Sequence, residues 1–216
     1  MTQNTGTTKM PKAPDKWFKR QIELGNGIFD RESYEMCLRH VPDFRVAIDC
    51  GAHVGSWTRA LAEKFEVVHA FEPEKQNYDF LKENTAHCEN VFTYNYAVGE
   101  DEDIMELLPG SENSGQFHLS ATTGAAGVAV FPLDMMVEAD CVDFIKIDVE
   151  GFELFVLQGA REIIEICSPA IMVEMNGLSE RYGYYDSELR SYFKEIGYEL
   201  VSGCNKDFLF KRSAQE

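Results

Sequence analysis

The stretch Asp49-Cys50-Gly51-Ala52-His53-Val54-Gly55 decides the fold of this chain. It follows a short apolar run, residues 46–48, and precedes an amphipathic stretch that begins near Ser56. A strand, a tight glycine turn and a helix in this order hold a nucleotide-like cofactor on an open α/β sheet, because glycines let the backbone approach the ligand. Glu72 ends a second apolar run about 20 positions after Gly51, where an acid reaches ribose hydroxyls. The sequence therefore predicts a cofactor that contains a ribose.

Strand-like and helix-like patterns alternate from Phe44 to the end of the chain. The expected strands cover residues 46–49, 67–72, 91–98, 144–148 and 170–175, and the expected helices cover a stretch from about residue 56, then 74–84, 151–167 with a bend at Gly159, and 187–196. Two further strands, 198–202 and 208–211, are joined by a link too short for a parallel crossover, so they should pair antiparallel. The pattern predicts one α/β domain with a doubly wound, Rossmann-like and mostly parallel sheet, closed by a C-terminal antiparallel hairpin.

Three parts of the chain are expected from changes in composition. Residues 1–16 are polar and are expected to form a disordered leader, residues 17–43 an N-terminal helical segment, and residues 44–212 the domain itself. Within the domain, residues 100–133 break the alternation with short strand-like runs separated by Gly, Ser and Asn. We expect these runs to form an insertion near the sheet edge or over the pocket, followed by a short helix, 135–139, capped by Asp134.

The composition excludes several partners. The net charge of −17 over 216 residues, with no dense Lys/Arg run, argues against a nucleic acid or an anionic membrane. No apolar run approaches the roughly 18 residues of a membrane span, and no signal peptide precedes the domain, so a cytoplasmic location is expected. The six cysteines form no C-x-x-C pair, which disfavours zinc and fits reduced thiols.

The glycine turn distinguishes between two cofactors. In the dinucleotide fingerprint G-x-G-x-x-G, the second glycine admits the pyrophosphate, and here that position is His53. S-adenosylmethionine has no phosphate, and Asp49 at the strand end could complement its sulfonium and ammonium. We therefore favour S-adenosylmethionine. An NAD-dependent oxidoreductase of Rossmann type and a non-catalytic cofactor-binding protein remain the alternatives.

A second group of polar residues surrounds the strand at 144–148. Lys146 is unusual there, because parallel strands are normally apolar on both faces. Since strand side chains alternate, Lys146 and Asp148 should lie on the same side, with Asp148 at the carboxyl end where ligands bind. The two could form a structural ion pair, or one of them could act in catalysis or in orienting the substrate.

The chain resembles the FkbM-type methyltransferases at several segments. The matching segments are Asp49–Thr58, which is similar to the signature D-V-G-A-N-x-G-x-Y-T, then Phe71-Glu72-Pro73, Leu133-Asp134, Ile145–Glu153, Val156–Ala160 and Pro169–Glu174. The run Lys146-Ile147-Asp148-Val149-Glu150-Gly151 is the most specific of these. Cys50 and His53 depart from the Val and Asn of the signature.

The resemblance implies class I binding of S-adenosylmethionine and O-methylation of a sugar or a small hydroxylated metabolite. By position, Gly51, Ala52 and Gly55 would lie along the methionine part and Glu72 would hold the ribose. Residues at the end of the third strand, around Asn95–Val98 and including Ala97, would approach the adenine, as would the turn at Ser114-Gly115. Asp148 would lie near the transferred methyl group and the acceptor.

A hydroxyl acceptor also needs a group that takes its proton as it attacks. The candidate bases are His53, Asp148, Glu150, Glu174 and His118. A divalent metal such as Mg²⁺ on the three acids could replace a base, although we favour a side chain. Tyr182, Tyr184 and Tyr185 could contact the faces of a sugar, but packing of their loop is the more ordinary interpretation. The acceptor would be a small molecule or saccharide, and the sequence leaves the oligomeric state open.

Overall fold

A computed structural model describes residues 10–110, 114–120, 127–138 and 140–213. Among these residues, seven strands form the central sheet, in the order β10 (Tyr198–Cys204), β11 (Asp207–Arg212), β9 (Ala170–Glu174), β8 (Val142–Ile147), β1 (Val46–Cys50), β2 (Val67–Phe71) and β3 (Val91–Tyr94). Neighbouring strands from β9 to β3 are parallel, whereas β11 pairs antiparallel with both β9 and β10. The predicted doubly wound sheet and its C-terminal antiparallel hairpin are thus confirmed.

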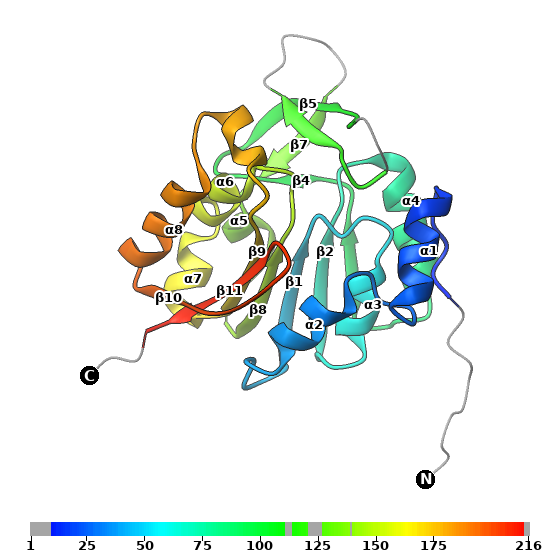
Figure 1. The fold of residues 1–216 in the computed structure, drawn as a ribbon, viewed down its shortest axis with the longest axis horizontal. Helices are drawn as coiled ribbons and strands as arrows, with labels where there is room; N and C mark the ends of the chain where they lie inside the picture. The colour runs from blue at the N-terminus through cyan, green and yellow to red at the C-terminus, as the bar shows by residue number, and fades with distance from the viewer. Residues whose placement is uncertain (1–9, 111–113, 121–126, 139, 214–216) are drawn as a thin grey trace.

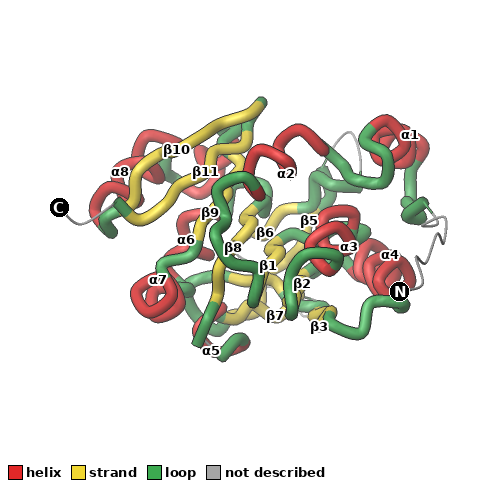
Figure 2. The backbone as a smooth tube through the Cα atoms, turned by 90° about the horizontal axis from the view of Figure 1, so that it is seen from below, coloured by secondary structure: helices red, strands yellow, loops and turns green. Residues whose placement is uncertain are grey.

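Helices cover both faces of this sheet (Figures 1 and 2). On one side lie α1 (Lys16–Leu24), α2 (Arg31–Leu38), α3 (Ser56–Ala62) and α4 (Lys75–Thr85); on the other lie α5 (Leu133–Met136), α6 (Glu153–Gln158), α7 (Arg161–Cys167) and α8 (Asp186–Glu195), with a short 3₁₀ helix, η1 (Leu178–Tyr182), after β9. Alternation along the strands divides the core between the faces. Ile48 and Ile145 pack with α6 to α8, whereas Ala47 and Phe144 pack with α2 and α3. None of the helices in the described ranges combines the length and apolar composition needed to cross a membrane.

The insertion and residues 97–98 before it form a small second sheet. Its four described strands are ordered β4 (Ala97–Val98), β7 (Val128–Phe131), β5 (Asp103–Leu108) and β6 (His118–Ser120). Figure 1 places β5 and β7 above the carboxyl ends of the central strands, where a parallel sheet binds its ligands. Residues 111–113 and 121–126 of the expected insertion lie outside the described residues. Leu119 and Val130 are buried in the same core as Ile145, so the small sheet packs as part of the domain.

The predicted strand 91–98 is wrong, because the chain turns after Tyr94. The side-chain amide of Asn95 donates to the carbonyls of Glu72 and Pro73, at 2.9 and 3.0 Å, and thereby holds the turn against the end of β2. Residues 97–98 then leave the central sheet and pair with β7 as strand β4. Val91–Tyr94 alone remains in the central sheet.

Asp134 caps a different helix from the one predicted. Helix α5 begins at Leu133, after Pro132, and it ends at Met136 rather than at residue 139, which lies outside the described residues. The Asp134 carboxylate instead accepts from the backbone N–H groups of Glu162 and Ile163, at 2.9 and 3.0 Å. Its capping acts across space on α7, which no local sequence pattern indicates.

The predicted bend at Gly159 is a full break between α6 and α7. A Cβ at this position would lie 1.8 Å from the carbonyl oxygen of Gly99, so only glycine allows this close approach. The two shorter helices pack on β8 and place the insertion next to the sheet.

Residues 10–15, expected as part of a disordered leader, pack against α4 instead, whereas residues 1–9 lie outside the described residues. The backbone N–H and carbonyl of Lys12 both pair with the side-chain amide of Asn84, at 2.8 Å each. Asp15 caps α1 by accepting from the N–H of Phe18 at 2.7 Å. This segment therefore brings α1 to the edge of the cavity described next.

Candidate functional site

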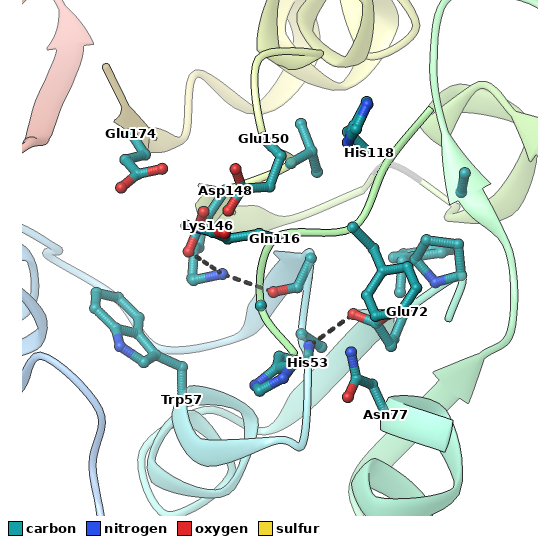
Figure 3. Close-up of a pocket in the computed structure, with 18 of the residues that line it drawn as sticks. His53, Trp57, Glu72, Asn77, Gln116, His118, Lys146, Asp148, Glu150 and Glu174 are labelled. Atoms are coloured by element: carbon teal, nitrogen blue, oxygen red, sulfur yellow. Dashed lines mark hydrogen bonds and ion pairs between the residues drawn. The ribbon is translucent and has the colours of Figure 1, made fainter. Parts of the chain in front are cut away.

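A cavity of about 490 Å³ lies at the carboxyl ends of β1, β2, β8 and β9. Its walls come from the glycine turn after β1, the ends of β2 and β8, helix α1 and the insertion residues 115–119. Figure 3 shows Glu72 and Asn77 on one side of this pocket and Asp148, Glu150 and Glu174 on the other. The topology of a parallel α/β sheet thus gathers the polar residues of four strands at one site.

The two glycines of the turn have packing reasons for their identity. A Cβ on Gly51 (φ +75°) would lie 1.8 Å from the carbonyl oxygen of Asp148, and one on Gly55 (φ +80°) would lie 2.7 Å from Leu81. Gly51 lines the cavity and Gly55 does not. We expected both glycines to lie along the ligand, and only Gly51 is placed to do so. Gly55 instead allows the close packing of α3 on α4.

Glu72 is held at the end of β2 by backbone donors. Its carboxylate accepts from the N–H of His53 at 2.9 Å and from the N–H of Glu74 at 2.8 Å. Burial raises the pKa of Glu72 to about 7, although these two N–H groups oppose the shift. Glu72 lines the cavity, whereas Asn95 lies behind it and supports the backbone of Glu72. Asn95 is thus a support and not a wall of the cavity.

Lys146 and Asp49 form a buried ion pair beneath the cavity. The Lys146 ammonium lies 3.1 Å from an Asp49 carboxylate oxygen and 3.7 Å from Asp148, and it donates to the Gly51 carbonyl at 3.1 Å. Burial opposes its charge, but the carboxylates of Asp49 and Asp148 raise the pKa of Lys146. Thr58 donates to the other Asp49 oxygen at 2.7 Å.

This pair corrects the role expected for Asp49. Asp49 is fully buried and does not line the cavity, so its charge is compensated by Lys146 and is not directed at a ligand. Lys146 and Asp148 do lie on the same side, as strand alternation predicts, and both line the cavity. Lys146 thus forms its structural ion pair with Asp49. Its longer contact with Asp148 connects this buried pair to the cavity.

Three carboxylates converge on the opposite side of the cavity. One oxygen each from Asp148, Glu150 and Glu174 lies within 4.8 Å of the others. Burial, and then the charge of Asp148, raises the pKa of Glu150 to about 8 and that of Glu174 to about 10. Asn176 donates to Glu174 at 2.6 Å. The cluster can share protons at neutral pH, and its hard oxygen donors could also hold a divalent cation.

His53 connects the glycine turn to two distant segments. Its Nε2 lies 2.9 Å from the Ser114 hydroxyl, which in turn lies 2.5 Å from an Asp15 carboxylate oxygen. The ring packs edge-on against Phe18 with ring centroids 4.1 Å apart. Burial lowers the pKa of His53 to about 4, against the opposing charge of Asp15. Ser114 itself does not line the cavity, but it contacts His53 and Asn77, which do.

The other predicted residues divide between the cavity and the packing around it. Ala52, Ala97 and His118 line the cavity. Tyr182 donates to the Leu119 carbonyl and Tyr184 to the Gly151 carbonyl, so these hydroxyls pack the loop onto the body. Tyr185 is exposed, and none of the three tyrosines lines this cavity.

Sequence reasoning missed several residues that line the cavity, and three of them come from helices that carry no motif. Trp17 and Phe18 enter from α1, and Asn77 from α4 donates to the Ser114 carbonyl at 2.8 Å. The adjacent aromatic pair after a polar leader was the available signal for α1. Nothing in the local pattern indicates Asn77, because its role depends on the insertion folding back onto α4.

The strand order and the cavity at the carboxyl ends of the strands define the class I methyltransferase fold. Two solved structures share it. A methyltransferase FkbM from Methylobacillus flagellatus matches with a TM-score of 0.53 and 21% identity over 78% of this chain and 44% of that one. A protein from Streptococcus mutans, solved in complex with SAH, matches with a TM-score of 0.53 and 14% identity, over 84% of this chain and 95% of that one.

Residues 49–200 match the family model described as the methyltransferase FkbM domain. The chain belongs to the FkbM methyltransferase family, as its sequence motifs predict. It is also similar to the hexuronic acid methyltransferase AglP of Haloferax volcanii, with 25% identity over 140 residues. That match covers 63% of this chain, and the chain spans 58% of the length of the Haloferax protein.

Proposed function

We propose that this protein transfers the methyl group of S-adenosylmethionine to a hydroxyl group of a saccharide or another small hydroxylated molecule. One observation carries the proposal: a single cavity joins Glu72, at the end of β2, to the carboxylates Asp148 and Glu150, beyond the end of β8. Membership of the FkbM family favours methyl transfer over the nicotinamide-dependent alternative. The convergent acids favour an enzyme over a passive cofactor-binding protein.

The residues on the β2 side of the cavity fit S-adenosylmethionine. Glu72 is a carboxylate fixed by two backbone donors, and its remaining lone pairs can accept from both ribose hydroxyls. Gly51 and Ala52 line the path proposed for the methionine part, and Ala97 and Val98 line the side proposed for the adenine. The apolar strand ends at 97–98 suit a flat aromatic base.

The chemistry requires little more than positioning and removal of a proton. When bound, S-adenosylmethionine supplies a methyl carbon already activated by its sulfonium, so alignment of the acceptor provides much of the rate. We assign the proton to Glu150, because its pKa of about 8 is close to neutral pH, where a general base works best. Asp148 lies beside Glu150 in the acidic cluster, and the Lys146 ammonium lies 3.7 Å from the Asp148 carboxylate. Glu174 is the third member of the cluster.

The proposed acceptor class has two supports. The Haloferax relative is named a hexuronic acid methyltransferase, which makes a sugar acid a reasonable first acceptor to test. The acceptor side of the cavity also carries Lys206, a cation close to the acidic cluster that could pair with a sugar carboxylate. The acid-rich wall itself can accept from several sugar hydroxyls.

Calorimetry with S-adenosylhomocysteine tests the cofactor. We expect binding by the wild type, and a loss of roughly tenfold or more in Glu72→Ala with the fold intact by circular dichroism. Glu72→Gln is the matched control, since it keeps the size but not the charge. Absence of binding by well-folded wild-type protein would contradict the proposal.

Transfer of a labelled methyl group, followed by mass spectrometry on glucuronic and galacturonic acid glycosides, tests the reaction. Glu150→Gln should lower kcat by roughly 100-fold or more while the affinity for S-adenosylhomocysteine stays unchanged. We expect activity to survive treatment with EDTA and dialysis, because the proton acceptor is a side chain. Loss of activity that Mg²⁺ restores would instead assign the acid cluster to a metal.

A further inference from the structure

Three segments far apart in the chain meet at His53. Asp15 precedes α1, Ser114 precedes β6 in the insertion, and His53 lies in the glycine turn after β1. The contacts run from the Asp15 carboxylate to the Ser114 hydroxyl at 2.5 Å, and from that hydroxyl to His53 Nε2 at 2.9 Å. These contacts form a hydrogen-bond chain that ends on Nε2 of His53, and His53 lines the cavity.

Counting hydrogen atoms assigns the tautomer of this ring. Burial opposes ionisation of Asp15, but the N–H of Phe18 and the Ser114 hydroxyl lower its pKa, so the group is a carboxylate that can only accept. The single hydrogen of the Ser114 hydroxyl is directed to Asp15, which leaves that oxygen only lone pairs to offer. Nε2 of His53 must then carry the hydrogen of the neutral ring.

The other ring nitrogen is consequently a bare acceptor. Nδ1 of His53 is buried and has no hydrogen-bond partner among the residues that the structure describes. The ring cannot turn away freely, because Phe18 packs against it and Ser114 holds Nε2. A buried acceptor without a donor is costly, and a ligand that donates a hydrogen bond there would remove that cost.

The turn also lacks a free charge for a cationic ligand. Asp49, the acid of the glycine motif, is fully buried and paired with Lys146 at 3.1 Å. The backbone N–H of His53 donates to Glu72, the proposed ribose carboxylate, so the methionine part would lie beside the ring. The strongest donor of that part is its α-ammonium, and an uncharged ring accepts from it without repelling the nearby sulfonium.

We propose that His53 Nδ1 accepts a hydrogen bond from the α-ammonium of S-adenosylmethionine, and that Asp15 and Ser114 are positioning residues that hold the required tautomer. The inference rests on the proposed function. In this proposal the N-terminal segment and the insertion act on the cofactor through Asp15 and Ser114, although neither segment contains a cofactor-binding motif.

Nitrogen NMR of the full chain with labelled histidine tests the tautomer without any ligand. The His53 signals, identified by their loss in His53→Asn, should be those of the Nε2–H form in the wild type. Ser114→Ala and Asp15→Asn should each shift the ring toward a mixture of tautomers. A wild-type ring in the Nδ1–H form would overturn the positioning role, whatever the outcome with the cofactor.

Two related ligands test the ammonium contact. S-adenosylhomocysteine carries the ammonium, and 5′-methylthioadenosine has the same nucleoside and sulfur without it. The first should move the Nδ1 signal and the second should not. His53→Ala should weaken S-adenosylhomocysteine roughly tenfold and leave 5′-methylthioadenosine unchanged, and His53→Asn, whose amide oxygen can replace Nδ1, should restore most of the loss.

The outcomes separate this inference from the proposed function. Equal effects of the two ligands on Nδ1, or equal losses of affinity in His53→Ala, would overturn the ammonium contact while binding itself supports the proposed cofactor. Failure of both ligands to bind the folded wild type would overturn the proposed function and the contact together. A proton passed from the acceptor to His53 would instead appear as a fall in kcat in His53→Asn with unchanged affinity for S-adenosylhomocysteine, and this too would overturn the inference.

Discussion

At the level of single residues, Lys146 supplies the positive charge that compensates the buried carboxylate of Asp49. It is almost fully buried, and it neutralises Asp49, whose carboxylate has no exposure to solvent. Removal of one partner from a buried ion pair leaves the other charge uncompensated. We therefore expect Lys146→Met to lower the free energy of unfolding by about 3–5 kcal/mol, as measured by urea denaturation.

The double variant Lys146→Met/Asp49→Asn is the matched control. It removes both charges while keeping an acceptor for Thr58, so it should recover a large part of the lost stability. A loss of less than about 1 kcal/mol in the single variant would contradict the buried-charge interpretation, because an exposed pair contributes no more than that.

Residue identities at the site were largely predictable, but their geometry was not. The motif residues Gly51, Glu72 and Asp148 line the cavity as expected. His53 and Glu150 adopt positive φ angles, +50° and +57°, which side chains other than glycine rarely take. Such strain depends on the contacts around each turn, and a linear sequence does not contain those contacts.

At the level of elements, the turn after β1 packs closely against the residue that follows β8. A Cβ at Gly51 would overlap the carbonyl of Asp148, whereas Gly177 has a similar φ of +80° and nothing within 4 Å of its Cβ position. Gly177→Ala should therefore cost about 1–2 kcal/mol, the conformational penalty alone. Gly51→Ala should cost clearly more, because backbone must move as well.

Thermal unfolding of the two glycine variants, with S-adenosylhomocysteine binding as a second measurement, separates the two costs. Equal losses of stability would mean that the turn relaxes around the new methyl group. The comparison isolates close packing from backbone conformation, since both glycines share the left-handed region.

Asp134 offers an element-level test of the corrected cap. Because its carboxylate accepts from the first N–H groups of α7, Asp134→Ala should cost about 1 kcal/mol. Hydrogen exchange should accelerate at Glu162 and Ile163 and not in α5. Asp134→Asn keeps an acceptor and should lose less, and faster exchange confined to α5 would restore the original local interpretation.

The sequence predicted elements well where the pattern was local, and failed where long-range contacts decide. The strand at 91–98 is continuous in its pattern, yet Asn95 turns the chain by pairing with the end of β2. Asp134 precedes a helical stretch, yet it caps a helix that begins 27 residues later at Arg161. In both cases a polar side chain satisfies backbone groups that are distant in sequence.

At the level of the whole molecule, the cavity is a joint product of the sheet, the insertion and the N-terminal segment. The sheet supplies Glu72 and Asp148, the insertion supplies His118, and α1 supplies Trp17 and Phe18. Only the first contribution follows from the order of strands and helices. The others depend on where two irregular segments fold back, which is why the motif residues were predictable and the covering residues were not.

Burial raises the pKa of several carboxyl groups at once, three that line the cavity and two, Glu153 and Asp207, that do not. Burial raises the pKa of Glu72, Glu153 and Asp207 to about 7, that of Glu150 to about 8 and that of Glu174 to about 10. An acid whose pKa is higher in the folded chain binds its proton more tightly there, so its stabilising contribution is complete below its unfolded pKa. That contribution is lost as the pH rises through the folded value. The protein without ligand should therefore lose stability between pH 6.5 and pH 8.

The buried histidines act in the opposite sense, but at lower pH. Burial lowers the pKa of His53 to about 4, so its contribution is complete above about 6.5 and is lost only as the pH falls toward 4. Between pH 6.5 and 8 the acids dominate the pH dependence, and the free energy of unfolding should fall by roughly 2–5 kcal/mol per pH unit. Urea denaturation at constant ionic strength measures this slope.

Glu174→Gln removes the carboxyl group with the highest pKa, together with its repulsion of the Glu150 carboxylate. This variant should therefore flatten the slope, whereas Glu195→Gln, in the last turn of α8, should not. A stability that stays level or rises from pH 6.5 to pH 8 would show that the carboxyl groups of the cavity are already ionised, and it would remove the proton-sharing basis for Glu150 as the general base.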